Sequence, residues 1–271
     1  MAYRSINVML AVAALAGKGL AAVTPEMTLD ERYLARRALK TGQGTRYGDS
    51  DGCTEEDCWQ SGACAFTDYT LPDGIEGSTC VSEEIWNDGA NCGGCISVTY
   101  KGKTITVMVS DLALSEPALT KDVVLTWYAA KVTNRTGGGA NHLDMTPATW
   151  AKLTNGLSGG GVDGIEWDFV ACPIAQSEPL WIKMHNGASQ YWVAATVENA
   201  RRRTDKLEVS GDEGKTWKAT TRNRNNFFVM DGTLDSDSAW VRVTSHTGTQ
   251  VVVNNVALKS EQVTKAGGNY A

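Results

Sequence analysis

The sequence predicts an all-β protein made of two successive domains, and three features of the chain support this prediction. A length of 271 residues suits two domains of roughly 100 to 150 residues each. Glycine occurs 28 times and helix-favouring runs are few, which favours β structure with many turns. Six of the seven cysteines lie between Cys53 and Cys95, and none follows Cys172, so the chain changes character after that residue.

The N-terminal segment is typical of a secretion signal. Arg4 provides a short positive start, and Val8–Ala16 is an unbroken apolar run of the length that signal peptides use. This run is too short to span a membrane, and no other apolar stretch is long enough. We therefore expect residues 1–22 to be a signal peptide and the mature protein to be secreted, with no membrane segment. Residues 23–41 form an N-terminal segment to which we assign no chemistry.

Residues 42–176 carry the signals of a first domain. Over Thr104–Ser110 apolar and polar residues alternate, which predicts a strand with one buried face. This strand ends on Asp111 and so places a carboxylate at a strand end. Met145–Leu153 has the pattern of a helix, with a threonine cap and a proline at its first position.

The second domain begins after a polar, proline-bounded stretch that ends at Pro179. Beyond it the chain consists of short apolar runs separated by turn residues, which predicts a small β-sandwich over residues 177–262 and a tail over residues 263–271. The expected strands are Leu180–His185, Tyr191–Val197, Lys206–Ser210, Phe227–Met230, Ala239–Ser245 and Gln250–Val253.

Charge and cysteine usage exclude several classes of function. A formal net charge of −6 argues against a nucleic-acid partner, which needs a basic face. Clustered cysteines in a secreted chain predict disulfides. A zinc site at Cys92-Gly-Gly-Cys95 is the alternative, but the chain lacks a second paired ligand motif, and its three histidines stand far apart. We expect no metal, no cofactor and a monomer.

Five short motifs, in this order along the chain, resemble the landmarks of the first domain of the expansin family. They are Gly62-Ala-Cys64, Cys92-Gly-Gly-Cys95, Val109-Ser-Asp111, His142-Leu-Asp144 and Val170-Ala-Cys-Pro173. The resemblance covers roughly residues 42 to 260 and extends to the related family-45 endoglucanases. It implies a six-stranded double-psi β-barrel followed by an immunoglobulin-like β-sandwich that binds carbohydrate.

The resemblance also implies which cysteines pair and which residues line the cleft. Its disulfides would be Cys64–Cys92 and Cys95–Cys172, which leaves Cys53, Cys58 and Cys80 without assigned partners. Asp144 matches the acid of the endoglucanases, which expansins retain, and Asp111 matches the second acidic residue of the expansin cleft. Thr45 and Tyr47 match the polar floor of that cleft.

Asp49 is the residue that separates two hypotheses about activity. Thr45-Arg-Tyr-Gly-Asp49 resembles an endoglucanase signature whose last residue is the catalytic base, which expansins lack. Here Gly48 replaces the aromatic residue that would pack the base in place, and glycine leaves the backbone free. Asp49 is therefore either a solvated turn residue or a working base. Ala113, where bacterial expansins have tyrosine, is a second departure from the pattern.

In the second domain the resemblance points to exposed aromatic rings that cover the flat face of a sugar. Tyr191 and Trp192 fall where expansins have paired tryptophans, and His185 falls where bacterial members have a binding lysine. Consecutive residues of a regular strand point to opposite faces, so both rings meet one ligand only where the strand is irregular. If the strand is regular, one ring belongs to the core. The third platform position is Asn225, which is not aromatic.

The resulting hypothesis is an extracellular, cell-wall protein that binds cellulose, xyloglucan or a related β-glucan and loosens it without hydrolysis. The first alternative is an inverting endo-β-1,4-glucanase with Asp144 as acid and Asp49 as base. The second is a carbohydrate-binding module that has no loosening activity.

Overall fold

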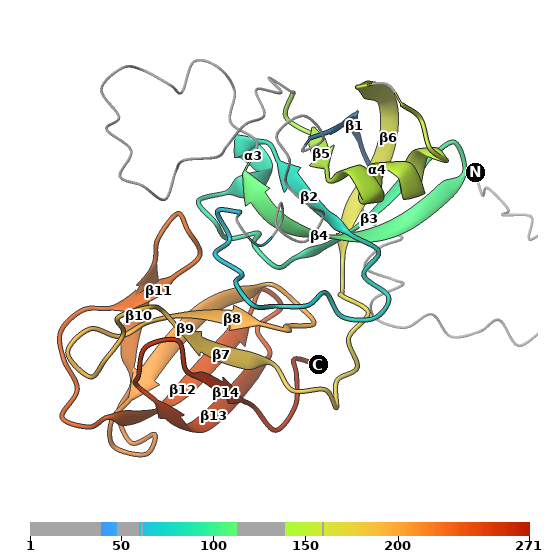
Figure 1. Ribbon diagram of the computed structural model, residues 1–271. Coiled ribbons are helices and arrows are strands. Elements are labelled where there is room, and N and C mark those ends of the chain that lie inside the picture. The colour runs from blue at the N-terminus through green and yellow to red at the C-terminus, as the bar shows by residue number, and fades with distance from the viewer. Residues whose placement is uncertain (1–38, 48–59, 61, 113–138, 159) are drawn as a thin grey trace, which may run out of the picture. The chain divides into compact units, whose positions relative to one another are not determined.

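The computed structural model describes residues 39–47, 60, 62–112, 139–158 and 160–271, and all of these belong to one compact unit, Arg37–Ala271. Strands dominate this part of the chain, and the two helices are short (Figure 1). None of the helices in the described ranges is long and apolar enough to cross a membrane.

The first half of the described chain forms a closed barrel with the strand order β1-β5-β2-β4-β3-β6 (Figure 1). The pairs β1–β5 and β2–β4 are parallel, and the other neighbours are antiparallel. The barrel strands are β1 Lys40–Arg46, β2 Ser78–Val81, β3 Cys95–Tyr100, β4 Lys103–Leu112, β5 Leu143–Met145 and β6 Gly161–Val170.

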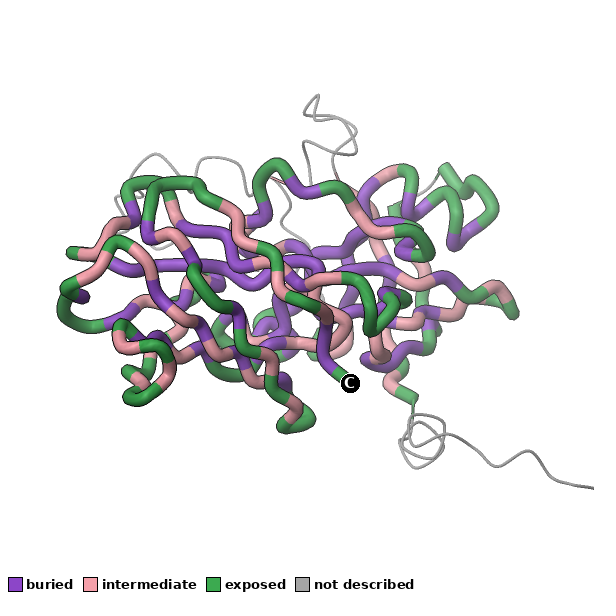
Figure 2. The backbone as a smooth tube through the Cα atoms, turned by 90° about the horizontal axis from the view of Figure 1, so that it is seen from below, coloured by how far each residue is buried: buried purple, intermediate pink, exposed green. Residues whose placement is uncertain are grey.

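Local sequence explains how the barrel strands bury their side chains. In β4 the alternating Ile105, Val107 and Val109 are buried, as the period of two predicts. Two short helices border the barrel strands in sequence, α3 Glu83–Trp86 and α4 Pro147–Thr154, the second of which has Thr146 at its N-cap and proline in its first turn. Figure 2 shows buried stretches running through the interior of the molecule and exposed stretches at the outer bends of the chain.

The second half forms an eight-stranded, sandwich-like sheet in the order β13-β12-β9-β10-β11-β8-β7-β14. A second hydrophobic core, separate from that of the barrel, fills it. The predicted fold class, a six-stranded barrel followed by a β-sandwich, is confirmed. The strands are β7 Trp181–Met184, β8 Ala194–Glu198, β9 Thr204–Ser210, β10 Lys218–Arg222, β11 Phe228–Met230, β12 Ser238–Ser245, β13 Gln250–Ala257 and β14 Val263–Lys265.

The expected tail at residues 263–271 is part of the sandwich instead. Strand β14 pairs antiparallel with β7, and Tyr270 is fully buried, with its hydroxyl 2.9 Å from Thr204 Oγ1. A three-residue strand has too few positions for a period of two to be recognised, so its sequence carries no strand signal. Within the sandwich, β10 is the other strand that the sequence did not predict.

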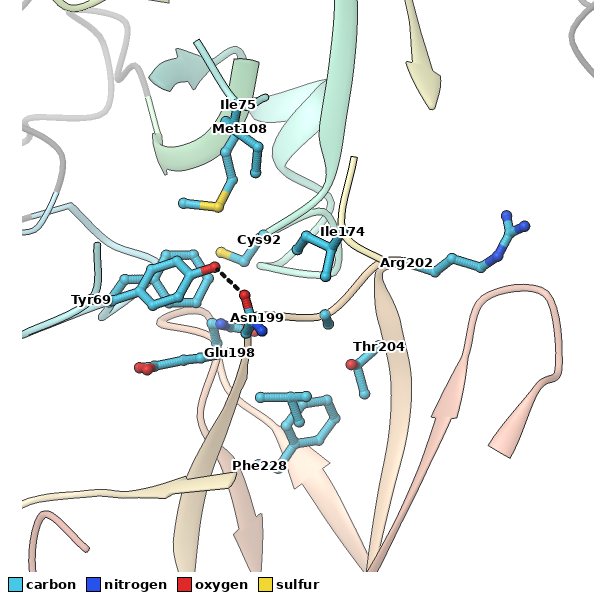
Figure 3. Close-up of a pocket in the computed structure, with 15 residues that line it drawn as sticks. Tyr69, Ile75, Cys92, Met108, Ile174, Glu198, Asn199, Arg202, Thr204 and Phe228 are labelled. Carbon is cyan, nitrogen blue, oxygen red and sulfur yellow. Dashed lines mark hydrogen bonds between the residues drawn. The ribbon is translucent and has the colours of Figure 1, made fainter. Parts of the chain in front are cut away.

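The barrel and the sandwich make direct contacts. Lys183 of β7 donates a 2.7 Å hydrogen bond to the hydroxyl of Thr67, and Arg224 pairs with Glu83 at 2.5 Å. Between the two lies a cavity of about 10 Å³, the space for one water molecule. Tyr69 and Glu198 both line this cavity, and the dashed line in Figure 3 marks the bond that the Tyr69 hydroxyl donates to Asn199 Oδ1, which is 3.5 Å long. The cavity is too small for a sugar and belongs to the packing of the junction.

Candidate functional site

Strand register brings four polar side chains into one row across the barrel wall. Thr45 of β1 lies opposite Asp144 of β5, Asp144 lies opposite Cys80 of β2, and Cys80 lies opposite Asp111 of β4. Asp144 and Cys80 are buried, and Thr45 and Asp111 are half-buried. Thr45, Asp111 and Asp144 are predicted site residues, and the strand register brings all three into this row.

The hydroxyl of Thr45 joins Asp144 to His142. Its Oγ1 donates a 2.5 Å hydrogen bond to Asp144 Oδ1 and lies 2.7 Å from His142 Nε2. A hydroxyl has one proton, so a Thr45 that donates to Asp144 must accept from the ring, which assigns the proton of His142 to Nε2. Burial lowers the pKa of His142, which agrees with a neutral ring. His142 therefore orients the carboxyl rather than ionising.

Asp111 is fixed by the backbone. Its Oδ1 accepts hydrogen bonds from the N–H groups of Ala63 at 2.7 Å and Leu112 at 2.8 Å. Desolvation nevertheless raises the pKa of Asp111 to about 6, because its effect outweighs that of these two hydrogen bonds. Asp111 thus changes its charge near pH 6. Both of its backbone partners donate to the same oxygen, Oδ1.

Tyr47 directly follows β1 and adds a hydroxyl to the site. Its backbone N–H donates to Met145 O at 3.0 Å, and its buried hydroxyl has no hydrogen-bond partner among the described residues. Burial raises the pKa of Tyr47 well above its usual value, and the acidic neighbours Asp111 and Asp144 raise it further. The phenol therefore stays neutral and can act as a hydrogen-bond donor.

Cys80 is the member of the row that the sequence analysis left without a role. Strand β2 is buried at all four positions, so alternation could not tell which face of the strand looks into the site. Only its pairing with β4 and β5 places the thiol between the two carboxyl groups.

Both disulfides that the family resemblance implies are present in the structure. Cys64 bonds to Cys92, and Cys95 bonds to Cys172. The second joins the start of β3 to the chain just after β6 and closes the longer loop, with a separation of 77 residues. Asp49, Cys53, Cys58 and Ala113 lie outside the described residues.

The aromatic residues of the second domain lie just before β8, outside the regular sheet. Tyr191 is 71% exposed and Trp192 is 40% exposed. Trp192 pairs with Ser189 in an isolated bridge, and the regular strand starts only at Ala194. The alternation that would send one ring into the core therefore does not apply, and both rings face solvent.

His185 links the Trp192 ring to a third aromatic residue, Phe227. Its ring centroid lies 4.9 Å from that of Trp192 and 4.4 Å from that of Phe227, in both cases edge to face. Phe227 is half-buried, while its neighbour Asn225 is exposed. Phe227, rather than Asn225, is thus the candidate for the third binding ring, because the turn before β11 decides which side chain reaches His185.

The chain thus combines a closed barrel that carries a row of polar side chains with a sandwich that carries exposed aromatic rings. Residues 180–257 match the family model of the Expansin C-terminal domain. The chain is 23% identical over 239 residues to Expansin-like protein 6 of Dictyostelium discoideum, a match that covers 86% of this chain and 72% of that protein. By these matches the chain is similar to expansin-like proteins over most of its length.

Two solved structures have a similar fold. The crystal structure of the apo expansin of Clavibacter michiganensis matches with a TM-score of 0.65 and 21% identity. A mutant of that expansin in complex with cellohexaose matches with a TM-score of 0.63 and 20% identity. Each match covers 86% of this chain and 98% of the other. The similarity spans both the barrel and the sandwich.

Proposed function

We propose that this protein is secreted, binds cellulose or a related cell-wall β-glucan, and loosens it without hydrolysis. The observation that carries the proposal is the exposed cluster of Tyr191 and Trp192 with His185 and Phe227 beside it. Aromatic faces cover the apolar CH surface of a pyranose, and an imidazole beside them can bond its hydroxyls. The cellohexaose complex of an expansin with a similar fold supports the same class of ligand.

The barrel contributes the polar part of the proposed mechanism. Asp144 is held by Thr45 at 2.5 Å, and its row continues through Cys80 to Asp111. Thr45 and Asp111, the half-buried members of the row, are the groups that can reach a sugar hydroxyl, and the strands define their positions. Competition between these groups and the hydroxyls of a neighbouring glucan chain would separate chains that hydrogen-bond to each other, with no covalent bond broken.

Hydrolysis with inversion would need more than Asp144. A second, ionised carboxylate must hold a water on the opposite side of the glycosidic bond, with the two carboxyl groups about 6.5–9.5 Å apart. Asp49 is the residue of the sequence that matches this base, and it follows Gly48 rather than an aromatic residue. Because a small misplacement of a base costs about a hundredfold in rate, we favour the non-hydrolytic activity.

Wall creep and release of reducing sugar, measured on the same preparations, test the proposal. We expect the wild-type protein to cause creep with negligible sugar release, Asp144→Asn to lose creep, and Asp49→Asn to have a mild effect. Steady sugar release that Asp49→Asn abolishes would identify an endoglucanase. Binding to glucan without creep, unchanged in Asp144→Asn, would identify a binding module.

Secretion has its own test. When the full chain is expressed in a secreting host, we expect the protein in the medium, with a new N-terminus near residue 23. Retention inside the cell with Met1 intact would contradict this part of the proposal.

A further inference from the structure

His185 opens a tight turn that follows β7. The Ala188 N–H donates to His185 O at 3.0 Å and closes the turn over residues 185–188. Gly187 has a φ of 85°, whereas Asn186 lies outside the left-handed region. This combination is a type II turn, in which the central peptide is flipped relative to the commoner type I turn. The carbonyl of Asn186 belongs to that peptide, so the turn type decides where its oxygen points.

The Asn186 oxygen assigns the tautomer of His185. Nδ1 of the ring forms a hydrogen bond with Asn186 O. A carbonyl oxygen has no proton and can only accept, so Nδ1 must carry the hydrogen. A neutral imidazole has one such hydrogen, which leaves Nε2 unprotonated, with a lone pair that points away from the Asn186 carbonyl.

This lone pair is accessible beside the exposed rings. Nε2 of His185 has no hydrogen-bond partner in the described part of the chain, and it is not one of the buried polar atoms there that lack one. It therefore reaches solvent. The imidazole packs edge to face against Trp192 and Phe227, with centroids 4.9 Å and 4.4 Å apart. A ligand that covers the exposed Trp192 ring is thus a neighbour of this nitrogen.

An unprotonated Nε2 distinguishes two classes of polysaccharide. A hydroxyl of a neutral glucan has a proton that it can donate to the lone pair. The carboxylate of a uronic acid is an acceptor only, so its contact with Nε2 would bring two lone pairs together. The faces of the Tyr191 and Trp192 rings act in the same direction, because the face of an aromatic ring carries negative partial charge. A lysine at position 185 would instead donate to hydroxyls and carboxylates alike.

We propose that His185 determines the specificity of the aromatic cluster, because its Nε2 accepts a hydrogen bond from a hydroxyl of a neutral glucan and cannot bind the carboxylate of an acidic polysaccharide. The glucan part of this statement rests on the proposed function. The tautomer of His185 does not, and it can be measured without any polysaccharide.

The tautomer is measured by NMR on the folded, full-length protein with ¹⁵N-labelled histidine at pH 8. Protonated and unprotonated ring nitrogens have well-separated ¹⁵N shifts, and His185→Gln identifies the signals. We expect a protonated Nδ1 and an unprotonated Nε2. His142 is the internal control, because its hydrogen bond with Thr45 assigns the opposite tautomer, with the proton on Nε2. A proton on Nε2 of His185 would overturn the proposal.

Three variants of His185 test the selection itself. His185→Leu has no nitrogen and should weaken adsorption to insoluble cellulose by about two- to tenfold, the effect of one hydrogen bond. His185→Gln keeps an acceptor and should retain most of the adsorption. His185→Lys replaces the acceptor by a cationic donor. At pH 8 it should be retarded several-fold more than the wild type on gels that contain polygalacturonate.

Gln250→Lys is the matched control, because it adds the same charge at an exposed position of β13. Its retardation by polygalacturonate should stay close to that of the wild type. An equal gain in both lysine variants, or wild-type adsorption of His185→Leu to cellulose, contradicts the proposal. If His185→Leu does not fold, the tautomer of the wild-type protein and the two lysine variants decide.

Failure of the proposed function would look different. If the wild-type protein does not adsorb to cellulose, the proposed function is wrong. The tautomer and the comparison of the lysine variants on polygalacturonate then still decide whether His185 selects against carboxylates.

Discussion

One hydroxyl, that of Thr45, joins the two polar residues of the His142-Leu-Asp144 motif. Thr45 belongs to β1, which runs parallel to β5. Its Oγ1 lies 2.5 Å from Asp144 Oδ1 and 2.7 Å from His142 Nε2. Residues two apart in an extended segment share a face, so the spacing of the motif allows both side chains to reach the same partner. The motif and the threonine thus form one unit, although 97 positions separate Thr45 from His142.

The first prediction is that Thr45→Val lowers the unfolding free energy by about 1–3 kcal/mol and abolishes wall loosening. The variant keeps the shape of the side chain but leaves Asp144 and His142 without their shared partner. Urea unfolding and wall creep measure the two effects, and Thr45→Ser should preserve both properties. Thr99→Val is the control, because the Thr99 hydroxyl bonds only to Thr104 at the surface and should change stability by less than about 0.5 kcal/mol. Wild-type behaviour of Thr45→Val would show that the shared hydrogen bond has no role.

The second prediction concerns the exposed rings. Trp192→Ala should weaken adsorption to insoluble cellulose by a few-fold to about tenfold, the range of one aromatic contact. Its melting temperature should change little, because the ring is 40% exposed. Val252→Ala removes a similarly exposed apolar side chain (43%) from outside the cluster and should leave adsorption unchanged. A loss of several kcal/mol of stability in Trp192→Ala would instead make this ring part of the core.

The third prediction is a pH dependence that Asp111 introduces. Its pKa is about 6 in the folded protein against an ordinary 3.8, so the folded state binds the proton more tightly. The contribution of Asp111 to stability is therefore complete below pH 4 and is lost as the pH rises through 6, by at most about 3 kcal/mol. Relative to the wild type, Asp111→Asn should gain stability over this interval. Parallel stability curves of the two proteins from pH 4 to pH 7 would contradict the raised pKa.

The fourth prediction uses two glutamates with opposite shifts. Burial raises the pKa of Glu198 to about 7, whereas the bond with Arg242 lowers the pKa of Glu208. Glu198→Gln should therefore stabilise the protein at pH 8, and this gain should shrink as the pH falls toward 4.5. Glu208→Gln should destabilise the protein at pH 8, and this loss of stability should shrink only when the pH falls below the ordinary glutamate pKa of 4.5. Denaturant unfolding of both variants at pH 5 and pH 8 measures these changes. Changes in unfolding free energy of the same sign in the two variants at pH 8 would refute this account.

The fifth prediction compares the disulfides. Non-reducing peptide mapping should recover the pairs Cys64–Cys92 and Cys95–Cys172. Loop-closure entropy makes the disulfide of the longer loop, whose cysteines are 77 positions apart against 28, more stabilising by about 1 kcal/mol. The double alanine variant of Cys95 and Cys172 should thus be the less stable one. The reverse order would mean that native contacts, and not loop length, decide the contributions.

The sequence alone determined the architecture and much of the site. Cysteine distribution and turn spacing predicted two β domains, and the ordered motifs predicted the barrel, the sandwich and both disulfides. These features are local: a motif of three or four residues or a strand with a period of two is legible without knowing its neighbours. For the same reason the predicted strand at Thr104–Ser110 and the helix near Met145–Leu153 lie close to the observed β4 and α4.

Only the tertiary structure decided which residues meet. Register between β2 and its neighbours placed Cys80 between Asp111 and Asp144, and a slip of one residue would have turned it toward the core. The turn before β11 selected Phe227 as the partner of His185, and pairing with β7 made residues 263–265 a strand. Each of these contacts joins segments far apart in the chain, and their geometry depends on how many residues the strands shift against one another. No local pattern records that shift, because the same alternation fits every register that differs by two.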